Sequence, residues 1–213
     1  MKGEQSATKH AATRQRLIVF TQRFPYGRGE SFLAPELEVL ARNFDVLLLP
    51  AVRHRRRVHS IPAGVRLVPV PRGWIVALRM WLTLAWGRMT TDILGAVRMS
   101  PQIRTLPLVI ANIVQRYVRA SRCRIQLDAV LEDKEGSGIL YCYWGNAAAL
   151  SLALREPTPT FAVRFHGYDL YSYRAPGGVL PGFSRVISNA RMILTVSQHG
   201  VEHLRCTATD TLP

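Results

Sequence analysis

The sequence predicts an α/β fold with a Rossmann-like, doubly wound and mostly parallel sheet. Short aliphatic segments alternate along the chain with longer segments of helical period, which is the pattern of strands joined by crossover helices. The short segments are apolar at consecutive positions, as is typical of strands that are buried on both faces of a sheet. With 213 residues, of which 48% are hydrophobic, the chain is long enough to bury a core.

Three strands are expected in the first third of the chain, over residues 17–21, 45–49 and 65–70. The second and third are bounded by prolines, which end strands because they lack a backbone N–H. A glycine-containing loop, residues 23–30, follows the first strand. A helix is then expected over residues 31–43, because Leu33, Leu37 and Leu40 recur at the helical period.

The later elements repeat this alternation. Residues 73–133 are apolar and helical in character, and two proline-containing breaks divide them into two or three helices. Three further strands are expected over residues 139–144, 161–165 and 193–196. The small side chains of residues 146–154 predict a helix packed close to the sheet, and Ser197 is expected to cap a last helix that runs through Leu204.

We therefore expect one domain over residues 17–205, with residues 73–133 as a basic helical insertion. A flexible basic tail (1–16) precedes it, and an irregular end (206–213) follows it. The tail is too polar for a signal peptide. Three cysteines form no CxxC pair, which favours a reducing, cytoplasmic setting. Because carboxylates and histidines show no ligand spacing, we expect no metal and no cofactor.

The positive charge is concentrated in one region. The sequence holds 28 basic and 14 acidic residues, for a formal net charge of +14, and residues 51–124 contain fourteen arginines and a single acid, Asp92. A localised basic surface favours an anionic partner such as lipid headgroups, nucleic acid or a phosphorylated substrate. The arginines are not interleaved with a nucleic-acid-binding pattern, so we expect no nucleic acid partner.

Part of this basic region is typical of a helix at an anionic membrane surface. Tryptophan beside arginine lets an apolar ring enter the bilayer interface while the charge stays in water. The candidate membrane-docking residues are Arg53, Arg55, Arg56, Arg57, Trp74, Arg79 and Trp81. A solvated arginine loop and buried core tryptophans are the alternatives that the pattern leaves open.

Candidate binding residues follow the first strand, since ligands of doubly wound sheets bind outside the carboxyl ends of strands. Gly27, Arg28, Gly29 and Glu30 form a loop there. Two glycines let backbone amides approach a ligand closely, and the start of the next helix favours an anion. A tight turn explains the same spacing.

Two further groups follow the fourth and fifth strands. Tyr143, Trp144 and Asn146 are able to line a cleft, although core aromatics and a capping asparagine explain them equally well. After the fifth strand, His166 stands before a glycine and is followed by Asp169, so it is placed to bind a substrate or move a proton near neutral pH. A structural histidine bonded to Asp169 is the alternative.

Four motifs together carry a family resemblance. They are Phe24-Pro25-x-Gly-x-Gly-Glu-Ser-Phe-Leu with Pro35-Glu36-Leu37-Glu38, then Tyr143-Trp144, then Val163-Arg164-Phe165-His166-Gly167-Tyr168-Asp169-Leu170-Tyr171, and then Leu194-Thr195-Val196-Ser197. These motifs extend over about residues 17–204. Through them the chain resembles the N-terminal half of family-4-type (group 1) bacterial glycosyltransferases of the GT-B fold.

The resemblance implies a retaining enzyme of cell-surface polysaccharide biosynthesis. Such enzymes transfer a sugar from a nucleotide diphosphate sugar to a lipid-linked or oligosaccharide acceptor, and the N-terminal domain chiefly holds the acceptor. His166 would face the transferred sugar as the catalytic candidate, and Gly27 and Gly29 would lie near the donor phosphates. The other implied substrate-binding or supporting residues are Arg28, Glu30, Tyr143, Trp144, Asn146, Arg164, Tyr168, Asp169 and Ser197.

The resemblance also implies a second domain that carries the nucleotide site, with a basic pair and two glutamates eight residues apart. The sequence stops at Pro213, before such a domain, which leads us to expect a truncated chain that is inactive alone or is completed by a separate polypeptide. Its expected place is cytoplasmic and peripheral on the inner face of the bacterial plasma membrane. The alternative function is a non-catalytic basic module that binds a membrane surface or a partner.

Overall fold

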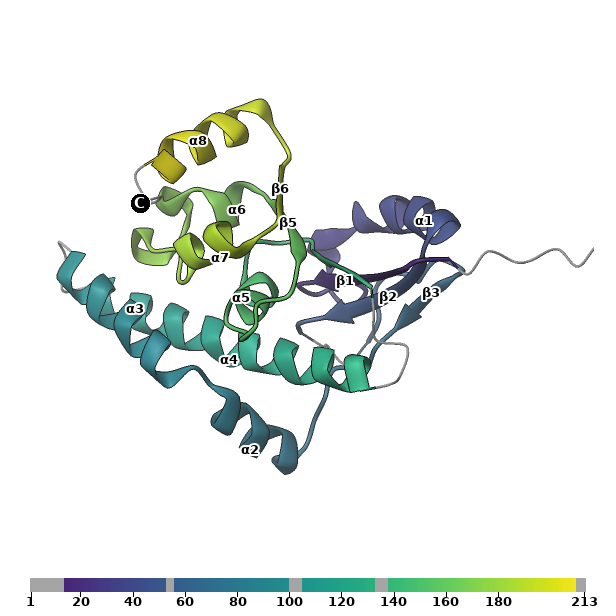
Figure 1. Ribbon diagram of the computed structural model, residues 1–213, viewed down its shortest axis with the longest axis horizontal. Helices are drawn as coiled ribbons and strands as arrows, with labels where there is room; N and C mark the ends of the chain where they lie inside the picture. Colours follow the sequence, from purple (N-terminus) through teal and green to yellow (C-terminus); the bar gives the residue numbers. More distant parts are fainter. Residues whose placement is uncertain (1–13, 53–55, 100–104, 133–137, 210–213) are drawn as a thin grey trace, which may run out of the picture.

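The structure is a computed structural model that describes residues 14–52, 56–99, 105–132 and 138–209. Its centre is a six-stranded sheet in which all neighbouring strands are parallel, in the order β3-β2-β1-β4-β5-β6 (Figure 1). The strands are β1 (Arg16–Thr21), β2 (Asp45–Pro50), β3 (Val65–Leu67), β4 (Ile139–Cys142), β5 (Phe161–Phe165) and β6 (Met192–Thr195). The predicted α/β fold with a Rossmann-like parallel sheet is confirmed.

Three strands end earlier than the sequence predicts, β6 by one residue and β3 and β4 by more. Shortly after β3 the chain reaches Pro69, which has no N–H to donate to a neighbouring strand. There the side chain of Gln126 donates to the carbonyl oxygen of Val68 at 3.1 Å. In β4, pairing with β1 continues only as far as the N–H of Tyr143, which donates to Phe20 O at 2.9 Å. Beyond that point the chain leaves the sheet.

Eight helices join the strands within the described residues. They are α1 (Leu33–Asn43), α2 (Trp74–Thr83), α3 (Trp86–Met99), α4 (Leu106–Glu132), α5 (Ala147–Ala153), α6 (Gly167–Leu170), α7 (Phe183–Asn189) and α8 (Gln198–Thr209). The helical region expected over residues 73–133 thus contains three helices. Figure 1 shows α4 as a long helix beside α5, with α2 and α3 on its outer side, and these pairs are in contact.

The two faces of the sheet are covered unequally. Helix α1 covers one face, where its Leu33 and Leu37 pack against Val19 of β1 and Val46 of β2. The other face is covered by α4, α5 and α7, and the larger hydrophobic core lies there. Every residue of α5 is buried, because its small side chains let the helix approach the sheet closely.

Two expectations about the ends of the domain need correction. Arg16, expected in the tail, belongs to β1 and pairs with Asp45 in the neighbouring strand. Helix α8 continues to Thr209, so the expected irregular end does not begin at residue 206. The hydroxyl of Thr207 donates to His203 O at 2.8 Å, and this bond lies within the last turns of the helix.

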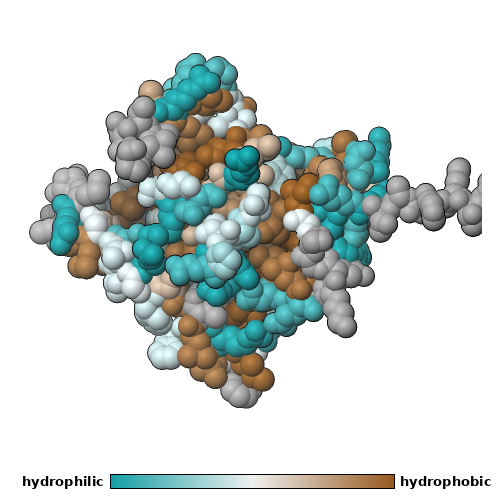
Figure 2. Space-filling model, in the orientation of Figure 1, coloured by the Kyte–Doolittle hydropathy of each residue, from teal (hydrophilic) through white to brown (hydrophobic). Residues whose placement is uncertain are grey.

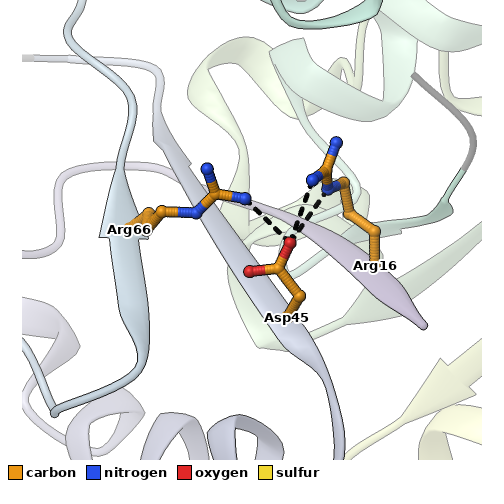
Figure 3. Close-up of polar contacts among 3 residues, drawn as sticks. All are labelled: Arg16, Asp45 and Arg66. Atoms are coloured by element: carbon orange, nitrogen blue, oxygen red, sulfur yellow. Dashed lines mark hydrogen bonds and ion pairs between the residues drawn. The ribbon is translucent and has the colours of Figure 1, made fainter. Parts of the chain in front are cut away.

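An ion-pair network joins three strands near their amino ends (Figure 3). Asp45 of β2 lies between Arg16 of β1 at 3.0 Å and Arg66 of β3 at 2.8 Å. Burial by itself would raise the pKa of Asp45, but hydrogen bonds and charges from the two arginines outweigh it and hold the pKa below its ordinary value. The network stabilises the edge of the sheet that lies opposite the candidate site.

Candidate functional site

The candidate site lies at the carboxyl ends of β1, β4 and β5. The sheet order places β2 on one side of β1 and β4 on the other, so connections diverge here as they do at the ligand crevice of doubly wound sheets. A cleft of about 670 Å³ opens at this point. It is lined by Gln22, Arg23, Gly29, Glu30, Arg116, Trp144, Asn146, Tyr168 and Asp169.

The side chain of Glu30 links the glycine loop, residues 27–30, to the end of β1 and to the loop that follows β4. Its carboxylate accepts backbone N–H groups from Gln22 at 3.1 Å and from Arg23 and Phe24 at 2.5 Å each. It also accepts the indole N–H of Trp144 at 2.5 Å. Four donors therefore hold a buried carboxylate, and the loop after β1 is attached to the loop after β4.

The two glycines of this loop differ in their surroundings. A Cβ at Gly27 would lie 2.7 Å from Arg23 Cβ, whereas a Cβ at Gly29 would meet nothing within 4 Å. Gly29 lines the cleft, and Arg28 beside it is exposed. His59 supports the loop from the segment after β2, because its Nε2 lies 2.9 Å from Gly27 O.

His166 lies in an enclosure of aromatic rings. Its ring centroid is 4.1 Å from that of Trp144, 5.3 Å from Tyr143 and 6.3 Å from Phe32. Burial, followed by the positive charge of Arg164, lowers the pKa of His166 to about 4, against a smaller opposing effect of Glu36. At neutral pH the imidazole is therefore uncharged and able to exchange hydrogen bonds with a polar ligand.

Arg164 supports this enclosure from behind. It pairs with Glu36 of α1 at 2.8 Å, donates to the hydroxyl of Tyr143 at 2.8 Å, and lies over the Tyr143 ring at 4.7 Å. The Tyr143 hydroxyl in turn donates to Glu36 at 2.9 Å. Burial and the bond to Glu36 raise the pKa of Tyr143 to about 12. Arg164 and Tyr143 thus form the wall on which His166 lies.

Asp169 joins the loops after β4 and β5. Its carboxylate accepts the N–H of Gly145 and that of His166, both at 2.6 Å. Burial raises the pKa of Asp169 to about 6, although the backbone donors and the charge of Arg116 oppose this rise. Both carboxylates that line the cleft, those of Asp169 and Glu30, are therefore occupied by backbone donors.

Arg116 is a site residue that the sequence analysis missed. It reaches the cleft from α4 and donates to the carbonyl oxygen of Gly145. Burial lowers its pKa to about 10, against the effect of Asp169, so the side chain remains a cation at neutral pH. The only sequence signal for it was the count of arginines, because helical periodicity does not distinguish one arginine from the next.

The remaining candidates occupy different places. Tyr168 lines the cleft and is 69% exposed, with Arg174 over its ring at 4.7 Å. Asn146 donates to Gln22 Oε1 at 2.7 Å and caps α5. Ser197 does not line the cleft, and its hydroxyl accepts the N–H of Gly200 at 3.2 Å at the start of α8.

Four of the candidate membrane-docking residues lie on the surface outside the cleft. Arg56, Arg57, Arg79 and Trp81 are exposed, whereas Arg53 and Arg55 lie outside the described residues. Trp74 is the first residue of α2. None of the helices in the described part of the chain combines the length and the apolar character needed to cross a bilayer.

Comparisons with protein-family models, with curated proteins and with solved structures found no match. Within the residues that the structure describes, His, Cys, Asp and Glu side chains form no group of three or more that could hold a metal ion. The interpretation of the cleft therefore depends on its own geometry and charge.

Proposed function

We propose that this chain forms the acceptor-binding half of a retaining glycosyltransferase. It would act with a nucleotide diphosphate sugar and a lipid-linked or oligosaccharide acceptor, at the inner face of a bacterial plasma membrane. The observation that supports this most is the convergence of Gly29, Trp144 and His166 at the switch point of the sheet. Residues that carry the family resemblance, although far apart in the sequence, contact one another there through Glu30 and Asp169.

The cleft suits a sugar and a phosphate. Trp144 lines the cleft and offers an apolar ring face, and neutral His166, which is not itself among the lining residues, packs against that ring. Arg23 and Arg116 supply positive charge beside the carboxylates of Glu30 and Asp169, whose oxygens already accept N–H groups. Such cations stabilise the negative charge that develops on a leaving phosphate.

The two carboxylates that line the cleft are placed as supports rather than as nucleophiles. A carboxylate nucleophile needs a free oxygen that points at the sugar, but Glu30 accepts four N–H donors and Asp169 accepts two. In this proposal both acids shape the cleft, and catalysis depends on binding the departing diphosphate and positioning the sugar. A second domain would supply most of the nucleotide contacts, so the donor would bind the cleft of this chain weakly, at millimolar concentration.

Ligand binding in solution tests the proposal. The whole chain, labelled with ¹⁵N, is titrated with millimolar UDP-glucose, GDP-mannose and related nucleotide sugars while its amide spectrum is recorded. We expect shifts at residues 27–30, 144–146 and 166–169, weakened by His166→Gln and unaffected by His203→Gln, which alters a histidine outside the cleft. Shifts confined to other surfaces, or none with any donor, would contradict the proposal.

A membrane-surface module without catalysis is the second candidate function. It is supported by the exposure of large apolar side chains on α2, a helix whose arginine is also exposed. These side chains are Ile75, Leu78, Trp81 and Leu82. Two results together would favour this candidate over the transferase. The His166→Ala variant would still bind anionic vesicles, and no nucleotide sugar would shift the amide signals of the cleft.

A further inference from the structure

A second cavity, of about 570 Å³, lies between α2, α3 and α4. Its apolar wall consists of Val76, Met80, Leu84, Met89, Val114 and Val118. This volume is within the range of small-molecule sites, about 300–1,000 Å³. None of the residues that line the cleft at the sheet edge lines this cavity, so the two are separate sites.

The charge of this cavity has one sign. Arg72 and Arg122 are the charged residues among those that line it, and none of the lining residues is acidic. The Nε atom of Arg122 is buried and has no hydrogen-bond partner among the described residues. An unpaired buried donor is costly, so an acceptor brought by a ligand would stabilise this arrangement.

Two tryptophans mark the rim of the cavity. Trp81 and Trp86 are 59% and 46% exposed, and their ring centroids lie 6.0 Å apart at an angle of 66°. The indole N–H of Trp86 donates to Trp81 O at 3.1 Å, which holds the pair together. Figure 2 shows hydrophobic residues at the lower end of the molecule, where Figure 1 draws α2.

We propose that this cavity binds one hydrocarbon chain of an anionic lipid. The chain lies against the apolar wall, and the headgroup phosphate binds Arg122 and Arg72. Charge complementarity selects this occupant, because a neutral lipid leaves both arginines unpaired and a free phosphate leaves the apolar wall in water. The inference goes beyond the proposed function, since neither His166 nor the cleft takes part.

Dodecyl phosphate is the probe for this site. Its binding to the whole chain is measured by calorimetry, below its critical micelle concentration, and compared with dodecyl maltoside and inorganic phosphate. We expect saturable binding of one dodecyl phosphate per chain and at least tenfold weaker binding of the other two compounds. Equal binding of dodecyl maltoside would overturn the role of the arginines, and equal binding of phosphate would overturn the role of the apolar wall.

Variants locate the binding in the cavity. Arg122→Gln and Arg72→Gln are each expected to weaken dodecyl phosphate binding about tenfold, as the loss of one charged hydrogen bond does. Arg88→Gln, at an exposed arginine that does not line the cavity, is the matched control and should bind normally.

Val76→Phe supplies a test that does not depend on charge. Val76 is partly exposed, so the larger ring should fill the cavity and abolish binding while the far-ultraviolet circular dichroism stays unchanged. Full affinity in this variant would refute the site. A failed cleft titration with nucleotide sugars would leave this result untouched, which separates the two proposals.

Discussion

At the scale of single residues, His166 shows how packing sets a protonation state. Three aromatic rings and the charge of Arg164 surround it, and both disfavour the imidazolium. We expect its C2–H resonance to titrate with a pKa of about 4, compared with about 6.5 for an unperturbed histidine. Nuclear magnetic resonance on wild type and His166→Gln assigns the signal, and a midpoint near 6.5 would show that the ring is open to water.

This low pKa also makes the stability of the fold depend on pH. The unfolded chain binds more protons at His166 than the folded chain does between about pH 4 and pH 6.5. The contribution of His166 to stability is therefore expected to fall as the pH falls through that window, whereas the raised pKa of Asp169 acts in the opposite direction. Urea unfolding at pH 7 and pH 5 should show a smaller loss for His166→Gln than for wild type.

Replacing the buried carboxylate of Asp169 should destabilise the fold. Asp169→Asn replaces one accepting oxygen with an NH₂ group that faces a backbone N–H of Gly145 or His166, so we expect a loss of about 1–3 kcal/mol in the free energy of unfolding. Asp128→Asn is the control, since its carboxylate makes a partly exposed ion pair with Arg155, worth about 1 kcal/mol or less. Equal losses in urea unfolding would argue against a special role for Asp169.

The sequence predicted single residues less well than motifs. His166, Trp144 and Asp169 could be placed at one edge of the sheet because they follow strands, and strand ends meet at one edge of a parallel sheet. Arg116 and the supporting role of Glu36 were missed, because each reaches the site from a helix face. Which helical side chain turns toward a strand end depends on how the helix packs, and that is set by contacts distant in sequence.

At the scale of elements, Gly145 allows the loop after β4 to lie close to the end of β5. A Cβ at Gly145 would lie 1.9 Å from the Phe165 ring, which is fully buried. Gly145→Ala must therefore displace a core side chain, and we expect a loss of about 1–3 kcal/mol in unfolding free energy.

Gly29, which lines the cleft, supplies the comparison for Gly145→Ala. A Cβ at Gly29 would have open space around it, and the residue has no positive φ, so Gly29→Ala should change stability by no more than about 0.5 kcal/mol. Thermal unfolding of both variants checks the difference. A tolerated alanine at residue 145 would mean that Phe165 moves easily.

The six strands and most longer helices could be predicted because their apolar patterns are local. Helix α7 could not, because its seven residues are few for a periodic signal and it follows Gly182 in a left-handed conformation. The same limit applies to the four-residue α6, whose start is fixed by the bond between Asp169 and the N–H of His166. Elements held by tertiary contacts leave little trace in the sequence.

At the scale of the whole molecule, the basic region is expected to govern binding to membranes. Sedimentation with vesicles that contain phosphatidylglycerol should show binding that weakens when salt is raised from about 0.1 M to 0.5 M, because counterions screen surface charge. Trp81→Ala should weaken this binding at every salt concentration. Tyr173→Ala, which also removes an exposed aromatic ring, should not, and equal losses in both variants would assign the effect to general surface change.

The position of β1 in the middle of the sheet also constrains how the chain folds. β1 pairs with β2, which follows soon after it, and with β4, where Leu17 meets Ile139 about 120 residues later. Closing so long a loop carries a large entropic cost, and distant strand pairing slows folding. We infer that the unit from β1 to β3 is able to form early, whereas the cleft, which needs β1 and β4 together, forms only after this long-range contact is made.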